Sequence, residues 1–290
     1  MKTRQSNPFH RHSARVAAFS VSLISHFAAP SASAATLYWD TDGTTAGFGD
    51  TAGTWGTSAF WSATASGASP HAATTATTTA DTLNFGTATL SLGATASGVS
   101  VGTVSAGSIT FGAGQTNPVV LSGGGITLAA TSTITVNNAA DTIGSNLSGP
   151  TTSLTKAGTG ALTLSGTNSY TGNTVVTGGT LNLTGSLSGN TTSSTLSLGS
   201  AATNTVANVS GNMTLFNITG AAVASSNAVY NQTAGTVNVT PTASTMFLTT
   251  VGYNHLNLTG GTLKVNAGTS LLASGTGVGV AYVGGTGLFD

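Results

Sequence analysis

Short stretches in which apolar and small polar residues alternate recur from residue 86 onward. Each is a glycine, any residue, an apolar residue, a small polar residue and a second apolar residue. The copies are GSITF (107–111), GGITL (124–128), GALTL (160–164), GTLNL (179–183), GNMTL (211–215), GTVNV (235–239) and GTLKV (261–265). This alternation is the period of a β-strand with one buried face. The pattern predicts short strands over these ranges, bounded by the Gly and Asn that tight turns favour.

The spacing of these units predicts how the strands assemble. Successive copies begin 17, 36, 19, 32, 24 and 26 residues apart, and the two long gaps contain the degenerate copies STITVNN (132–138) and STLSLGS (194–200). The underlying period is then about 17–26 residues. A five-residue strand cannot bury its apolar face alone, whereas stacked equivalent strands build a continuous core, along which matching Thr and Asn can form ladders. We therefore predict an all-β chain with a β-solenoid over residues 86–290.

The alternation in two of these strands also predicts which side chains point inward. The leucines of 160–164 and 179–183 share one face of their strands; they are Leu162, Leu164, Leu181 and Leu183. The other face carries Ala161, Thr163, Thr180 and Asn182. We expect the leucines to lie in the core and the small and polar residues to lie on the outside.

The first 34 residues have the pattern of an export signal. A basic segment, MKTRQSNPFHRHSAR, precedes the apolar run VAAFSVSLISHFAA and an Ala-x-Ala sequence at 32–34. These are the three parts of a secretory signal peptide. The alternative is a membrane anchor, but the apolar run is shorter than the ~20 residues that span a bilayer. We predict a signal peptide over 1–34, cleavage after Ala34, and no transmembrane segment in the mature chain.

The three tryptophans, Trp39, Trp55 and Trp61, all lie in residues 35–62. They could form a platform for stacking sugars or an aromatic plug over the open end of the solenoid core, which solenoids require at their termini. We favour the second interpretation and assign 35–62 as an N-terminal cap. The low-complexity sequence that follows predicts a polar linker, which together with a strand leading into the solenoid makes up residues 63–85.

Charge is scarce and unevenly placed. Charged residues make up 4% of the chain, against about a quarter in ordinary globular domains. Four of the six basic residues lie in the first fifteen residues, so the rest of the chain has two Lys against six Asp, a formal charge of −4. Nucleic-acid binding, which needs clustered cations, is excluded. There is no cysteine, so the chain has neither disulfides nor thiolate metal sites.

The carboxylates form one local cluster, Asp40, Asp42 and Asp50. The sequence DTDG (40–43) has the beginning of a calcium loop but lacks the later ligands and the terminal Glu, so an Asp-Gly turn is the better interpretation. Asp81 and Asp141 are isolated and each precedes a Thr, which predicts turn residues. We therefore expect no metal site and no cofactor site.

Other sequence motifs give equally weak support for catalysis. Ser100 lies in GVSVG, the pattern of a nucleophile elbow, but the sequence that follows predicts a strand instead of the required helix. Ser153 and Lys156 have the Ser-x-x-Lys spacing, yet on a strand they point to opposite faces, and we expect Lys156 to be exposed. His71 and His255 lack metal-ligand spacing and are expected at the surface. We predict no catalytic residue.

The segment LTKAGTGALTLSGTNSYTGNTVVTGGTLNL (154–183) resembles the passenger-associated transport repeat of autotransporter proteins. The matching positions are Leu154, Lys156, Gly158, Gly160, Leu162, Leu164, Gly166, Asn168, Tyr170, Gly172, Thr174, Gly179, Thr180 and Leu181. Later repeats, such as VGYNHLNLTGGTLKV, are similar to degenerate repeats of the same exported proteins. The resemblance implies a right-handed parallel β-helix at the cell surface or in the medium, with a repeat that is associated with passage of the passenger across the outer membrane.

These observations favour a non-catalytic exported passenger or adhesin-like fragment. Its expected partners are glycans, host or neighbouring cell surfaces, and the export machinery. The alternative is a carbohydrate-active β-helix enzyme, a polysaccharide lyase or hydrolase. The sequence ends at GGTGLFD inside a repeat, with neither a terminal apolar anchor nor strands typical of a membrane barrel. We therefore expect a chain that is truncated at the C-terminus, the alternative being one that depends on another exit route.

Overall fold

The computed structural model describes residues 33–43, 45–68, 76–93, 98–149, 152–199, 203–221, 226–240, 252–265, 278–283 and 288–289. The chain divides into two compact units, Met1–Ser31 and Ala32–Asp290, and every described residue belongs to the second. Most of the predicted signal peptide, and His71, lie outside the described residues. The regular elements within them are all β-strands, and no helix in this part of the chain is long and apolar enough to cross a bilayer.

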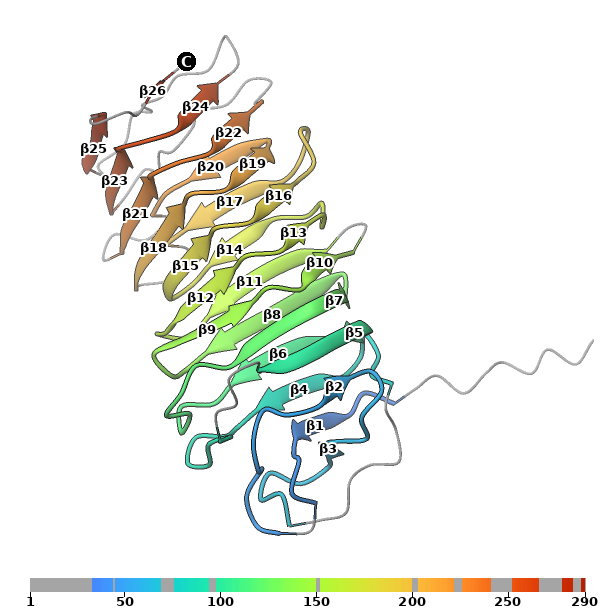
Figure 1. The fold of residues 1–290 in the computed structure, drawn as a ribbon. Helices are drawn as coiled ribbons and strands as arrows, with labels where there is room; N and C mark the ends of the chain where they lie inside the picture. Colours follow the sequence, from blue (N-terminus) through green and yellow to red (C-terminus); the bar gives the residue numbers. More distant parts are fainter. Residues whose placement is uncertain are drawn as a thin grey trace, which may run out of the picture. The chain divides into compact units, whose positions relative to one another are not determined.

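The strands form three sheets (Figure 1). Sheet 1 has the spatial order β20 (Asn217–Thr219), β17 (Thr195–Leu198), β14 (Thr174–Val176), β11 (Ser153–Ala157), β8 (Thr131–Val136), β6 (Ser108–Phe111), β4 (Thr82–Phe85), β1 (Thr36–Trp39) and β3 (Trp61–Ser62). Sheet 2 has the order β2 (Thr54–Trp55), β5 (Val99–Ala106), β7 (Val120–Leu128), β9 (Ala140–Ile143), β12 (Ala161–Leu164), β15 (Gly179–Leu183), β18 (Asn204–Val209), β21 (Asn227–Gln232), β23 (Tyr253–Leu258) and β25 (Val278–Val283), with β10 (Asn146–Ser148) also pairing β7. Sheet 3 consists of β13 (Thr167–Asn168), β16 (Ser186–Ser188), β19 (Asn212–Leu215), β22 (Thr236–Val239), β24 (Thr262–Val265) and β26 (Leu288–Phe289).

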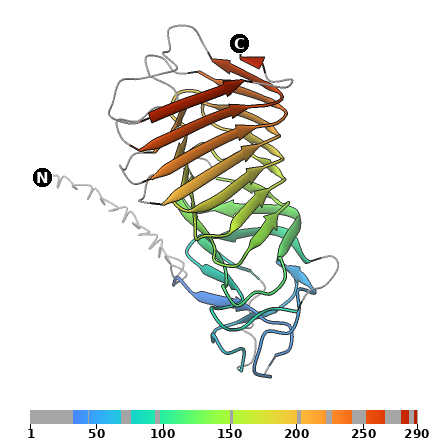
Figure 2. The ribbon, with the colours of Figure 1, turned by 90° about the vertical axis from the view of Figure 1, so that its left-hand side faces the viewer.

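The chain coils through these sheets in rotation. From β11 to β22, successive strands join sheet 1, sheet 2 and sheet 3 in turn, so each circuit adds one strand to each sheet. Figure 2 shows strands of successive circuits lying side by side. Among the described strands, β1 with β3 is the one antiparallel pair, and the others pair in parallel. The predicted parallel β-solenoid is confirmed.

The repeating sequence unit does not mark one position in the circuit. Its copies form β6 in sheet 1, then β7, β12 and β15 in sheet 2, then β19, β22 and β24 in sheet 3. Every strand of the solenoid needs one apolar face and a tight turn before it, whichever sheet it joins. The unit therefore predicts strands correctly but does not give the sheet to which each strand belongs.

The register of the stack places like positions above one another. Leu162 pairs with Leu181, and Leu181 pairs in turn with Ala207. The leucines of β12 and β15 are buried, with at most 4% of their surface exposed, whereas Thr163 and Asn182 on the other face are half-buried. The predicted inward and outward faces of these two strands are confirmed.

The N-terminal end of the stack is filled with aromatic rings. Trp39, Trp55 and Trp61 have no exposed surface. The Trp61 ring meets the other two edge-to-face, with centroids 5.1 Å and 5.6 Å away, and also contacts Phe85 at 5.8 Å. Phe85 stacks on Phe111 at 5.5 Å, one circuit further along. Because the three indoles are enclosed, their faces cannot serve as a platform for sugars.

Candidate functional site

The residues of the 154–183 signature lie on strands β11 to β15 and the turns between them, and most of their larger side chains point into the core. Those with at most 4% exposure are Leu154, Lys156, Leu162, Leu164, Asn168, Tyr170, Thr174 and Leu181. Two consecutive circuits of the solenoid are therefore packed through these positions. The signature describes how the two circuits hold each other and contains no exposed constellation of reactive groups.

The prediction that Lys156 is exposed is wrong. Its side chain has no exposed surface and shares an inward column with Ile134 and Val176, its partners in register on β8 and β14. The ammonium Nζ donates to three backbone carbonyl oxygens, those of Ala157 at 2.9 Å, Gly158 at 3.1 Å and Gly178 at 3.0 Å. A lysine ammonium has three N–H donors, so each one finds an acceptor.

Lys156 joins two successive turns of the chain. Ala157 ends β11 and Gly158 follows it, whereas Gly178 lies one circuit later, just before β15. Burial lowers the pKa of Lys156 to about 8. The three carbonyls favour the charged form because they accept hydrogen bonds from it, and at neutral pH the group is an ammonium. A single buried cation therefore stabilises a corner at which three carbonyl oxygens converge.

At the next corner, the buried side chain of Asn168 binds both N–H and carbonyl groups of the backbone. Its Oδ1 accepts a hydrogen bond from the backbone N–H of Leu147 at 3.1 Å, and its Nδ2 donates to the carbonyls of Gly166 and Ser186, both at 3.1 Å. The residues it contacts belong to three successive circuits. One amide side chain thus satisfies backbone groups that a parallel stack leaves unpaired where its strands turn.

Tyr170 and Thr174 form a hydrogen-bonded pair within the same signature, residues 154–183. The Tyr170 hydroxyl lies 2.9 Å from Thr174 Oγ1, and both side chains are buried. Burial raises the pKa of Tyr170 to about 12, so the phenol remains protonated at any physiological pH. This pair orients a large ring inside the core and leaves no free nucleophile.

Two glycines of the signature are required by close backbone approach. Gly158 has a φ of 79°, in the left-handed region that side chains disfavour, and a Cβ there would overlap the carbonyl oxygen of Val136. A Cβ at Gly172 would overlap the carbonyl oxygen of Thr152. Both positions lie where one circuit passes directly over the previous one, so the glycines set the spacing of the circuits.

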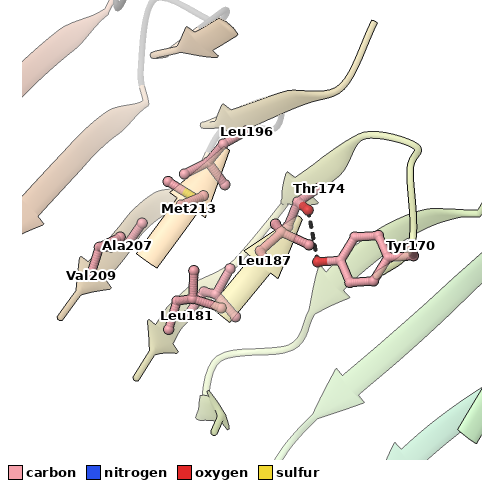
Figure 3. A pocket seen from close by; sticks show the side chains of 9 residues that line it. Tyr170, Thr174, Leu181, Leu187, Leu196, Ala207, Val209 and Met213 are labelled. Atoms are coloured by element: carbon pink, nitrogen blue, oxygen red, sulfur yellow. Dashed lines mark hydrogen bonds between the residues drawn. The ribbon is translucent and has the colours of Figure 1, made fainter. Parts of the chain in front are cut away.

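A small apolar cavity lies inside this part of the stack (Figure 3). Its lining comprises Tyr170, Thr174, Leu181, Leu183, Leu187, Leu196, Ala207, Val209 and Met213. Ala207 stacks between Leu181 and Tyr230 in the register of sheet 2, so the space arises where a small side chain follows a leucine. Its lining is almost entirely hydrocarbon and carries no ionisable group that titrates near neutral pH.

The prediction that Asp141 is a turn residue is wrong. Asp141 lies within β9, with 1% of its surface exposed, in the inward column that continues at Leu162. Its Oδ1 accepts hydrogen bonds from the N–H of Val119 at 2.7 Å and from Asn138 Nδ2 at 3.1 Å. Burial outweighs these bonds and raises the pKa of Asp141 to about 6. The carboxylate therefore links β9 to the chain just before β7, one circuit earlier.

The Asp81 prediction is correct. Asp81 follows the turn at 79–80, and its N–H donates to the carbonyl of Thr78 at 3.2 Å. The predicted Asp-Gly turn at 40–43 is likewise supported, because Asp40 Oδ1 accepts the N–H of Asp42 at 3.1 Å and Gly43 has a φ of 75°. Asp50 is bound locally by Thr41 and Ala52.

The remaining candidates are not brought together. Ser100 is an exposed residue within β5, on a strand as expected, and His255 is half-buried on β23. Within the described residues, no group of three His, Cys, Asp or Glu side chains could hold a metal ion.

The outward face of sheet 2 carries a continuous ladder of amides. Asn208 Nδ2 donates to Asn182 Oδ1 at 2.8 Å, Asn231 to Asn208 at 2.8 Å, and Asn257 to Asn231 at 2.7 Å. At the start of the ladder, Asn182 Nδ2 donates to Thr163 Oγ1 at 3.3 Å. The ladder predicted from matching Thr and Asn is confirmed, and it gives this face hydrogen-bonding groups without charge.

Comparison with known proteins agrees with the signature. Residues 154–183 match the family model of the passenger-associated-transport-repeat. Over 167 residues, or 56% of the chain, the sequence is 42% identical to the adhesin BmaC autotransporter of Brucella suis biovar 1 (strain 1330). The chain spans 4% of the length of that relative. No solved structure matches the chain. The predicted resemblance to an autotransporter passenger segment, with the transport repeat at 154–183, is confirmed.

Proposed function

We propose that the chain is a non-catalytic, adhesin-like passenger segment that is exported and displayed at the cell surface or released outside the outer membrane. The observation that carries this proposal is the 42% identity to an autotransporter adhesin over 167 residues, together with the transport repeat. The buried signature residues support a structural role for the repeat. The signal peptide over 1–34, the aromatic cap and the right-handed coil belong to the same proposal.

The transport repeat assists export by forming a pair of firmly joined circuits. Lys156 binds backbone carbonyls of both circuits, and Asn168 joins them to the circuits on either side. In a solenoid each circuit contacts only its neighbours, so a folded pair can template the next circuit as the chain emerges. The absence of cysteine also means that no disulfide has to form during passage.

The surface chemistry favours neutral polar partners such as glycans. The amide ladder offers donors and acceptors that match sugar hydroxyls, and Tyr253 on the same sheet is 56% exposed, which leaves its ring open to stacking. The described residues include two lysines, of which Lys156 is buried and Lys264 is exposed. A polyanion such as nucleic acid would find no cationic patch there.

Surface display and binding can be tested together. The chain is expressed in a Gram-negative host in fusion with an autotransporter translocator, and intact cells are treated with protease and applied to a glycan array. We expect the passenger to be cleaved on intact cells and the displaying cells to bind neutral glycans. Retention of the passenger inside the cell would contradict the export proposal. Loss of binding in Tyr253→Ala but not in the control Ser100→Ala, at an exposed position of β5, would then assign the binding to the neighbourhood of Tyr253.

The competing function is a carbohydrate-active β-helix enzyme. General acid-base chemistry on glycans needs two carboxylates or a carboxylate with a base, and the buried Asp141 and the turn-forming Asp40 and Asp81 are committed to backbone contacts. Incubation of the mature chain with polysaccharides should release no reducing ends and no unsaturated sugars. Release that is lost in an aspartate variant would replace our proposal with the enzymatic one.

A further inference from the structure

The described chain becomes structured at Ala35. Ser33 and Ala34 are exposed, whereas Ala35 is partly buried against the hydrophobic core and immediately precedes β1. The Ala35 carbonyl accepts the N–H of Thr82 at 2.8 Å, and its own N–H donates to Asp81 Oδ1 at 2.9 Å. This boundary coincides with the Ala-x-Ala cleavage sequence, which was identified independently from the leader.

Asp81 joins three neighbouring strands of sheet 1, β1, β4 and β6. Its carboxylate is nearly enclosed, with 5% of the residue's surface exposed, and Oδ2 accepts from the N–H and hydroxyl of Thr78 at 2.6 Å and 3.0 Å. Its carbonyl accepts the N–H groups of Gly107 and Ser108, which lead into β6. The residue therefore contacts the chain just before β1, β4 and β6.

No side-chain cation serves this carboxylate in the described residues. Lys156 is bound to the carbonyls of its own corner, and Lys264 is exposed on β24 of sheet 3. Among the described hydrogen bonds, no other titratable side chain contacts Asp81 or Ala35. A nearly buried carboxylate without a countercharge is costly, and the position 2.9 Å from it is the nitrogen atom at the predicted cleavage site.

We propose that cleavage of the leader creates the countercharge of Asp81. A leader peptidase hydrolyses the Ala34–Ala35 peptide bond with one water molecule, leaving a carboxylate on Ala34 and an amine on Ala35 that takes up a proton. The Ala35 nitrogen, already in contact with Asp81 Oδ1, then forms an ion pair in place of a hydrogen bond in which only the acceptor is charged. Processing thus anchors β1 to β4 and completes the N-terminal end of the stack. This inference rests on the proposed export.

The physical basis is the difference between the two donors. The ammonium adds the Coulomb attraction of a second full charge to a hydrogen bond whose acceptor is already ionised, and a partly buried pair is little screened by salt. The exposure of Ser33 and Ala34 means that their loss removes no packing from the described core. A chain that begins before Ala35 keeps the contact but not the charge.

A double-mutant cycle separates the ion pair from the rest of the fold. The mature chain with a free Ala35 amine is compared with the same chain Nα-acetylated and with a chain that begins at Ser33, each with and without Asp81→Asn. We expect the free amine to raise the unfolding midpoint by roughly 2–4 °C over both blocked forms. This difference should vanish in Asp81→Asn and persist in the control Asp42→Asn, which alters an exposed carboxylate. Equal midpoints of the free and blocked chains, or a difference that survives Asp81→Asn, would overturn the proposal.

A second measurement needs no variant. In the mature chain labelled with nitrogen-15 at alanine, NMR titration gives the pKa of the Ala35 amine. The ion pair should raise this pKa by about one unit above the ordinary 7.7–8.0, whereas burial without a countercharge would lower it. An unshifted or lowered pKa would contradict the ion pair even if Asp81→Asn failed to fold.

The outcome is distinguishable from that of the adhesin proposal. N-terminal sequencing of the exported protein should find Ala35 first, and any other first residue would overturn the processing step regardless of glycan binding. A correct N-terminus with a raised pKa but no binding to glycans or cells would instead contradict the proposed adhesin function and support the ion pair.

Discussion

The N-terminal end, from β1 to β4, and the transport-repeat block, from β11 to β16, fill their cores with different kinds of side chain. Around β1 to β4, large rings meet edge-to-face and one strand pair runs antiparallel. From β11 to β16, aliphatic side chains sit in parallel register and the chain visits the three sheets in strict rotation. An interior circuit is covered on both sides by similar circuits, so repeated leucines suffice. The end of a stack has no such neighbour, and under our proposal the bulky rings cap the core in place of another circuit.

The two regions also use charge differently. The N-terminal end uses the Asp81 carboxylate to accept backbone N–H groups, whereas the repeat block uses the Lys156 ammonium to donate to backbone carbonyls. In both places the charged group lies inside, at a corner between circuits. Asp81 and Lys156 therefore act as structural bonds between circuits, whereas Asp42 and Lys264 remain exposed.

The largest difference between the regions should appear when a ring is removed from the N-terminal end. Trp61→Ala deletes the ring that contacts Trp39, Trp55 and Phe85, and should cost about 3–5 kcal/mol of unfolding free energy. Tyr253→Ala, at a 56% exposed position, is the matched control and should cost far less. Denaturant unfolding and limited proteolysis measure both. Equal losses in the two variants would refute the aromatic-plug account.

Removal of a single leucine from the repeat block should be the next most damaging change. Leu162→Ala should cost about 2–5 kcal/mol through lost burial and an unfilled cavity. Thr163→Ala, its outward neighbour, loses half-buried surface and one acceptor of the amide ladder, and should cost far less. Because each circuit contacts only its neighbours, proteolysis of the leucine variant should begin near β12. Comparable protease sensitivity of the two variants would mean that the register is wrong.

The buried ammonium should have a smaller effect, which depends on pH. Lys156→Met keeps the apolar stem but leaves three carbonyls without their donor, and should cost about 1–3 kcal/mol at pH 7. The pKa of Lys156 falls from 10.5 to about 8 on folding. Between those values the unfolded chain binds more protons, so this group makes stability rise with pH. The variant should lack that rise, and the exposed control Lys264→Met should keep it in denaturation curves between pH 8 and 10.

Asp141→Asn is expected to have the smallest effect, and it should be favourable at neutral pH. Burial raises the pKa of Asp141 from 3.8 to about 6, so the folded chain binds more protons between these values and stability falls as pH rises through them. Asparagine keeps an acceptor for the Val119 N–H without the charge, and should gain roughly 1–2 kcal/mol at pH 7. Unfolding curves at pH 4 and pH 7 should show a smaller difference in the variant. An unchanged difference would exclude a raised pKa.

The successes of sequence-based prediction follow from what alternation encodes. Leu162 and Leu164 alternate with Thr163, and this local pattern fixes their faces without knowledge of the rest of the fold. The amide ladder followed from the same regularity. The sheet to which each strand belongs could not be predicted, because the same unit serves all three sheets and the intervening loops vary in length.

The failures at Lys156 and Asp141 have a common cause. Charged residues are ordinarily exposed. We therefore expected both residues outside the core, although each occupies an inward position on its strand. Yet Lys156 lies two residues after the buried Leu154, and Asp141 two residues before the buried Ile143, so each shares the inward face of its strand. The alternation of inward and outward side chains along each strand would have placed both residues in the core. Gly178, which accepts from Lys156, and Val119, which donates to Asp141, belong to other circuits, and no sequence signal identifies them.

The most direct test of the parallel stack is a register-specific cross-link. The chain has no cysteine, so introduced pairs report without interference. Thr163 and Asn182 are direct partners across β12 and β15, whereas Ala161 pairs with Thr180 and is offset from Asn182 by two residues along the strand. Under mild oxidation, Thr163→Cys with Asn182→Cys should form a disulfide in the folded chain, because direct partners lie within the Cα separation a disulfide tolerates. Ala161→Cys with Asn182→Cys should not. Cross-linking of the offset pair in preference to the direct pair would contradict the stacking of successive circuits on which the account depends.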